Sequence, residues 1–163
     1  MSAAAGQRAR RRNLGWTCSW IAVASGGALL VAAALQPFIV LDGESMAAIR
    51  EGGLGTPDGA LAAILLASGI AAIVLALLVV GLSRGGLRLV HCAIAPVGAV
   101  ILGGLVHLRA AGIDESVGVY TATFHPAMST TTGVGIGVAY AGLGVLVAAP
   151  VFVAGQILRL RRG

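Results

Sequence analysis

Four long apolar runs, separated by polar segments, constrain the fold of this chain more than any other feature. They cover residues 16–41, 60–82, 87–108 and 134–158. A helix needs roughly 20 mostly apolar residues to cross the hydrocarbon core of a bilayer, and each run is long enough. We therefore expect an all-α polytopic membrane protein whose four transmembrane helices pack as an antiparallel bundle.

The composition supports a membrane protein and argues against an ordinary soluble domain. The 163 residues are 58% hydrophobic and 10% charged, whereas soluble domains are about 45–50% apolar and about 25% charged. A soluble fold of this chain would expose apolar patches that aggregate. All eleven basic residues are arginine, and glycine and alanine are abundant. This bias is typical of a high-GC bacterium, so we expect the protein in a bacterial cytoplasmic membrane.

The charged residues sort to opposite sides of the predicted spans. Nine of the eleven arginines lie before the first run, around the turn at 83–86 or after the last run: Arg8, Arg10, Arg11, Arg12, Arg84, Arg88, Arg159, Arg161 and Arg162. All six acidic residues lie in the longer segments 42–59 and 109–133. Because cytoplasmic loops are rich in arginine, we predict cytoplasmic termini and outward-facing longer loops. The arginines would then contact anionic lipid headgroups, and we expect no nucleic-acid partner.

The segments outside the runs carry further predictions. Residues 1–15 are basic and too poor in apolar residues to fold alone, so we expect a disordered cytoplasmic N-terminus. Residues 159–163 should form a basic cytoplasmic C-terminus. The turn at 83–86 is so short that the second and third helices should form an antiparallel hairpin. The β-forming residues of Val117–Phe124 favour a short strand.

The first run has an alternative interpretation as a cleaved signal peptide. Residues 1–36 combine a basic start, an apolar stretch and a small-residue end at positions 32–34. The apolar stretch is about twice as long as a signal-peptide core of roughly 7–15 residues. Pro37 and Phe38 continue the run beyond the small residues, so we expect this segment to be retained as the first span.

Small residues at helical spacing are candidate helix-packing positions. Gly133, Gly137 and Ala141 are spaced four residues apart, so they share one face of the fourth helix and let a neighbouring backbone approach closely. We expect the same role for Ala22 and Gly26 in the first helix and for Gly103 and Gly104 in the third. The glycine string of the fourth run is not a dinucleotide fingerprint, because it lacks the preceding strand and the downstream acid. Packing of the fourth helix within the chain and packing against a partner are both open.

Ionisable residues are scarce inside the runs, which contain no Asp, Glu or Lys. Intramembrane charges mark ion pathways, so their scarcity counts against an ion-coupled transporter. His91 and His107 lie near the ends of the third run, where we expect them at the membrane interface. In the outward loop, Asp114, Glu115 and His125 match the spacing of no metal or nucleophile motif. We therefore predict no metal, no cofactor and no catalytic site.

Aromatic and sulfur residues cluster at the cytoplasmic ends of the first and third runs. We expect Trp16 and Trp20 to anchor the first helix at the interface. Cys18 and Cys92 lie at similar depths, as packing residues or as sites of lipidation. Two prolines lie inside predicted helices and should kink them: Pro96 and Pro150.

These patterns favour a non-enzymatic structural or accessory subunit that packs against a membrane protein partner or a second copy. One alternative is a small self-associating transporter or channel, and another is a membrane enzyme with its active site in the outward loops. The layout of basic termini, four spans and two outward loops is similar to that of small actinobacterial membrane proteins such as the tryptophan-associated transmembrane proteins. No motif accompanies this resemblance, so it implies no role for any residue.

Overall fold

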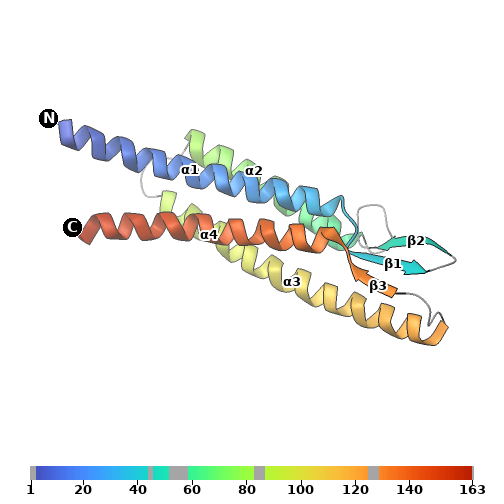
Figure 1. Cartoon of the computed structure of the whole chain (residues 1–163). Coiled ribbons are helices and arrows are strands. Elements are labelled where there is room, and N and C mark those ends of the chain that lie inside the picture. The colour runs from blue at the N-terminus through green and yellow to red at the C-terminus, as the bar shows by residue number, and fades with distance from the viewer. Residues whose placement is uncertain (1–2, 44–45, 52–58, 83–86, 125–128, 163) are drawn as a thin grey trace.

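The computed structural model describes residues 3–43, 46–51, 59–82, 87–124 and 129–162, which form four helices and three strands (Figure 1). Their order along the chain is α1 (Ala3–Ala34), β1 (Ile39–Gly43), β2 (Met46–Glu51), α2 (Ala60–Leu82), α3 (Leu87–Phe124), β3 (Ser129–Thr132) and α4 (Val134–Arg162). The predicted turn at 83–86 lies outside the described residues. α1 begins and α4 ends at one end of the bundle, which we call the terminal end. The strands lie at the other end, the sheet end.

Each helix contains a stretch that is long and apolar enough to cross a membrane. These stretches are Trp16–Ala34, Ala60–Val80, Ala93–Gly112 and Val134–Phe152. The predicted all-α membrane fold with four spanning helices is thereby confirmed, and the strands add a small sheet at one end of it. The observed bounds of α2 are those predicted from its apolar run.

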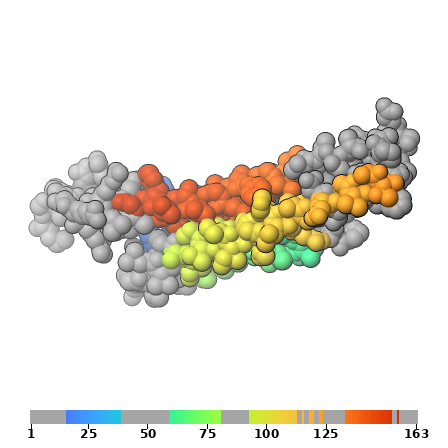
Figure 2. Space-filling model, turned by 90° about the horizontal axis from the view of Figure 1, so that it is seen from below, coloured from blue at the N-terminus to red at the C-terminus, as the bar shows by residue number. Residues whose placement is uncertain are grey.

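The helices pack unequally, because α1 lies at the centre and α3 at the edge. α1 packs along both α2 and α4. α3 packs along α4, as Figure 2 shows. Within the described residues, α2 and α3 contact each other only slightly, although they are consecutive in the chain. The apolar stretch of α1 is 44% buried and that of α3 only 17%. Most of the α3 surface is therefore open to whatever surrounds the bundle.

The first helix is shorter than predicted at its sheet end. It ends at Ala34 and not at residue 41, and Ile39–Gly43 forms strand β1. Pro37 explains the difference, because proline has no N–H to donate and disfavours helical backbone at the preceding residue. The apolar run continues past Pro37 only because β1 is also apolar.

A three-stranded antiparallel sheet joins the end of α1 to the start of α4. The strand order is β2-β1-β3, so the central strand β1 pairs with both others. The backbone N–H groups of Gly133 and Gly135 donate to the carbonyls of Phe38 and Pro37, at 2.7 and 3.1 Å. These bonds tie the chain after α1 to the first turn of α4. Strand β1 covers the predicted end of the first span, whereas β2 and β3 lie in the segments 42–59 and 109–133 that were predicted as loops. Pairing between segments far apart in the chain is what orders these strands.

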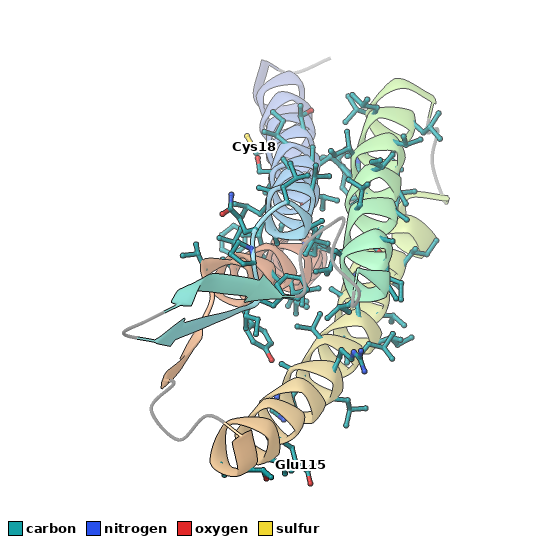
Figure 3. The ribbon with its side chains drawn as sticks, turned by 90° about the vertical axis from the view of Figure 1, so that its right-hand side faces the viewer. Cys18 and Glu115 are labelled. Carbon is teal, nitrogen blue, oxygen red and sulfur yellow. The ribbon has the colours of Figure 1, made fainter. Side chains whose placement is uncertain are left out.

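The third helix is much longer than its apolar run. It continues from Leu87 to Phe124, through much of the predicted loop at 109–133, and the predicted strand at Val117–Phe124 is wrong. Once a helix exists, each added residue gains one backbone hydrogen bond, so a helix propagates through residues with weak preferences. At about 1.5 Å per residue, α3 is about 57 Å long and exceeds the roughly 30 Å hydrocarbon thickness. Figure 3 shows its far end, marked by Glu115, beyond the neighbouring helices.

The terminal ends of α1 and α4 are also more helical than predicted. α1 begins at Ala3, so the predicted disorder of residues 1–15 is wrong for all but the first two residues, which lie outside the described ones. Alanine and arginine, which dominate this segment, are among the strongest helix formers. α4 continues to Arg162 for the same reason. The basic ends are thus extensions of the spanning helices.

Candidate functional site

Two glycines bring the backbones of α1 and α4 close together. A Cβ atom added at Gly26 would lie 3.0 Å from the carbonyl oxygen of Gly142, and one added at Gly142 would lie 2.9 Å from the carbonyl oxygen of Gly26. The two backbones therefore touch directly. Small residues permit such contacts between membrane helices, which gain dispersion energy and weak Cα–H···O bonds.

The next residue of α1 makes an equivalent contact with a different helix. A Cβ atom at Gly27 would lie 2.6 Å from the carbonyl oxygen of Gly69, and the reciprocal distance from Gly69 to Gly27 is also 2.6 Å. Consecutive residues of a helix point about 100° apart. Gly26 can thus contact α4 while the adjacent Gly27 contacts α2 at the same depth in the bundle. These two contacts hold α1 between α2 and α4.

The predicted helix-packing glycines mostly lie elsewhere. Gly133 and Gly135 sit against Pro37 and Phe38, at the junction with the sheet. Gly103 has only an ordinary contact, 3.7 Å to the Leu143 side chain. Added Cβ atoms at Gly104 and Gly137 would meet nothing within 4 Å in the described part of the chain, and Ala141 is exposed. Of the contacting glycines, Gly26 was among the predicted packing positions, whereas Gly27 and Gly69 were not, because spacing within one helix does not show which face meets a neighbour.

The small residues of α4 that do not pack inside the chain form a continuous exposed stripe. Between residues 135 and 150 the exposed residues are Gly137, Tyr140, Ala141, Gly144 and Ala148. The four small ones are spaced by four, three and four residues, which places them on one side of the helix. Added Cβ atoms at Gly137 and Gly144 would meet nothing within 4 Å. The stripe is therefore a shallow surface that a helix backbone can approach.

The exposed side of α1 also carries small residues, although one large side chain lies among them. Between residues 22 and 34 the exposed residues are Ser25, Ala28 and Ala32, and Cys18 lies one heptad before Ser25, with Ile21, 60% exposed, between these two. Figure 3 shows Cys18 on the outer side of α1. We call these eight residues the small-residue face: Cys18, Ser25, Ala28 and Ala32 of α1 with Gly137, Ala141, Gly144 and Ala148 of α4. Since the other sides of α1 and α4 contact α2, α3 and each other, this face looks away from α2 and α3.

Helices α2 and α3 present a different surface. Their apolar stretches expose large aliphatic side chains, which are Ile64, Ile70, Val74, Leu77, Leu78 and Val80 of α2 and Ile94, Val97, Val100, Ile101, Leu105 and Leu108 of α3. Exposed alanines lie among them on α2, at Ala60, Ala63, Ala67 and Ala71. Large aliphatic side chains suit contact with lipid chains, whereas small ones are enriched at helix–helix interfaces in membranes. The α2 and α3 surfaces therefore carry more large aliphatic side chains than the α4 surface between residues 135 and 150.

The tryptophans of α1 lie in the core of the bundle and not on its outer surface. Trp16 is 8% exposed and Trp20 is 1% exposed, and their rings meet edge to face at a centroid distance of 5.9 Å. Beside them, the hydroxyl of Ser19 donates to the carbonyl oxygen of Ala149 at 3.0 Å. This bond fixes the depth of α1 against α4 near the terminal end. Hydropathy could not show that neighbouring helices surround the indoles, because that burial depends on packing between segments far apart in the chain.

One polar pair links α3 to α4 nearer the sheet end. The hydroxyl of Tyr140 lies 3.4 Å from Nδ1 of His107, and both side chains are exposed. Arg109 and Glu115 are also exposed on α3. The side chains of His91 and Cys92, all of His125, and the nine clustered arginines are not among the described side chains. The described residues contain no group of three His, Cys, Asp or Glu residues that could hold a metal ion.

No protein-family model, curated protein or solved structure matches this chain. The class of this protein is therefore inferred from its own sequence and structure. The four long apolar helices are compatible with an integral membrane protein. Within that class, the feature that distinguishes one side of the bundle from the other is the small-residue face.

Proposed function

We propose that this protein is a non-enzymatic accessory subunit that docks a helix of a membrane protein partner against its small-residue face. The observation that carries the proposal is the exposure of four small residues on α4, which are Gly137, Ala141, Gly144 and Ala148. Tyr140 is the one large side chain that is exposed between residues 135 and 150. A lipid-facing surface has no need of such a stripe. A partner helix gains from it, because close backbone approach maximises packing.

The interior of the bundle supports this use of small residues. Gly26 with Gly142 and Gly27 with Gly69 are reciprocal contacts in which backbones touch. The chain therefore already joins its own helices through small residues at matched depths. The small-residue face repeats that chemistry on the exposed sides of α1 and α4.

The distribution of charge supports an orientation in a bacterial cytoplasmic membrane. Nine of the eleven arginines belong to the terminal ends of α1 and α4 or to the region around the turn between α2 and α3. All six acidic residues lie in the segments 42–59 and 109–133, which connect the other ends of the helices. The positive-inside rule then favours cytoplasmic termini. In this orientation the sheet and the far end of α3 project outward.

Affinity purification in mild detergent tests the proposal, with the protein tagged and expressed at its native level. We expect a second membrane protein to copurify with the wild-type chain. Ala141→Leu should reduce its recovery at least about tenfold, the change that corresponds to losing about 1.4 kcal/mol of binding free energy. The matched control is Ala67→Leu, on the exposed side of α2, which should leave recovery unchanged.

The same experiment separates the alternatives. Recovery of a differently tagged copy of this chain, lost in Ala141→Leu, would identify a self-associating protein. Isolation of a monomer alone, or equal recovery with Ala141→Leu and Ala67→Leu, would contradict the docking role of the small-residue face.

A further inference from the structure

The indole of Trp20 presents a buried hydrogen-bond donor without an acceptor. Its side chain is 1% exposed, and its Nε1–H has no partner in the described part of the chain. A buried polar group without a partner is costly in an apolar environment, and native proteins satisfy nearly all such groups with protein atoms or ordered water. The Trp20 N–H therefore requires an acceptor that the surrounding side chains do not provide.

A backbone acceptor without its helical donor lies at the same depth. Pro150 is fully buried in α4 and has no N–H, so it cannot donate to the carbonyl of Leu146. Trp20 follows Ser19 directly in α1, and Pro150 follows Ala149 directly in α4. Since the Ser19 hydroxyl bonds to the Ala149 carbonyl at 3.0 Å, Trp20 and Pro150 belong to one layer of the bundle.

Helix α3 adds a second acceptor of the same kind to this layer. Gly103 faces Leu143 across the α3–α4 contact. Pro96 lies seven residues from Gly103 in α3, and Pro150 lies seven residues from Leu143 in α4, both towards the terminal end. Because the two helices are antiparallel, the two prolines lie at one depth. Pro96 likewise cannot donate to the carbonyl of the residue four positions before it. One layer thus combines a buried donor with two carbonyls that lack helical donors.

We propose that this layer is a hydration site, in which water buried between α1, α3 and α4 accepts a hydrogen bond from Trp20 Nε1–H and donates to the carbonyl of Leu146. Buried waters typically make about three hydrogen bonds to otherwise unsatisfied groups. Trp20 lies four residues into the apolar stretch that begins at Trp16. That is about 6 Å along the helix, within reach of water in the headgroup region.

The two tryptophans of the chain make the site directly observable. Trp16→Phe leaves Trp20 as the sole indole, and its N–H can be followed in lipid bilayers by ultraviolet resonance Raman spectroscopy in H₂O and D₂O. We expect a hydrogen-bonded indole whose N–H signal is lost by exchange in D₂O despite its burial. Pro150→Ala in the same background restores a donor for the Leu146 carbonyl, so the indole marker should shift towards weaker hydrogen bonding.

Each other result overturns the proposal. A Trp20 indole without a hydrogen bond would mean that the donor stays unsatisfied, and a bonded indole that keeps its proton in D₂O would mean a direct protein acceptor. An indole marker unchanged by Pro150→Ala would exclude the Leu146 carbonyl. If Trp16→Phe fails to fold, water-edited solid-state NMR of the ¹⁵N-indole-labelled wild-type protein decides, because absence of transfer from water to both indole N–H groups contradicts the site.

Discussion

Replacing Gly27 by alanine tests the claim that glycine contacts hold α1 at the centre of the bundle. The new Cβ would lie 2.6 Å from the carbonyl oxygen of Gly69, about 0.8 Å closer than the 3.4 Å at which ordinary contact begins. The obstructing atom belongs to the backbone of α2, so no side chain can rotate away and the helices must separate. Overpacking of this kind costs about 1–3 kcal/mol, while alanine regains up to about 1 kcal/mol of helix propensity. We expect a net loss of about 1–2 kcal/mol in the free energy of unfolding.

The assay is reversible unfolding in mixed micelles with increasing SDS, followed by circular dichroism. Gly104→Ala is the matched control, because a Cβ at Gly104 would meet nothing within 4 Å. It should leave the free energy of unfolding unchanged or raise it by up to about 1 kcal/mol. If Gly27→Ala were as stable as Gly104→Ala, the reasoning from backbone contact would be refuted.

Three further predictions concern polar contacts and orientation. Ser19→Ala removes the hydroxyl that donates to Ala149 and should lower the free energy of unfolding by about 0.6 kcal/mol, the average for such bonds between membrane helices, in the same SDS titration. Tyr140→Phe removes a longer and exposed contact with His107, so it should cost less than about 0.5 kcal/mol; a larger loss than that of Ser19→Ala would contradict this ranking. Glu115→Cys, on the exposed far end of α3, should react with a membrane-impermeant maleimide in intact cells, and labelling only after lysis would reverse the proposed orientation.

The spanning helices were predictable because crossing a bilayer is a local requirement on length and apolarity. α2 shows this best, since its apolar run and its helix have the same bounds. The predicted helix ends were wrong where the apolar run and the helix do not end at the same residue. Pro37 ends the helical geometry of α1 inside an apolar run, and Asp114 and Glu115 look like loop residues although α3 continues through them.

The candidate site was predictable in kind but not in position. The sequence indicated that small residues would mediate helix packing, and it singled out Gly137 and Ala141. The structure places these two on the exposed face and assigns the internal contacts to other glycines, such as Gly142 and Gly69. Spacing shows which residues share a face, but the rotation of each helix in the bundle decides whether that face meets a neighbour.

From the sequence alone, the number of spans, the all-α class and the sorting of charge follow, because each depends on residues close together in the chain. Only the tertiary structure decided that α1 is central, that β1 pairs with β3, and that Trp16 and Trp20 are buried. These features depend on contacts between segments far apart in sequence. Helices with apolar residues on every side can pack in many rotations, so the close fit of a few glycines selects among arrangements that hydropathy cannot distinguish.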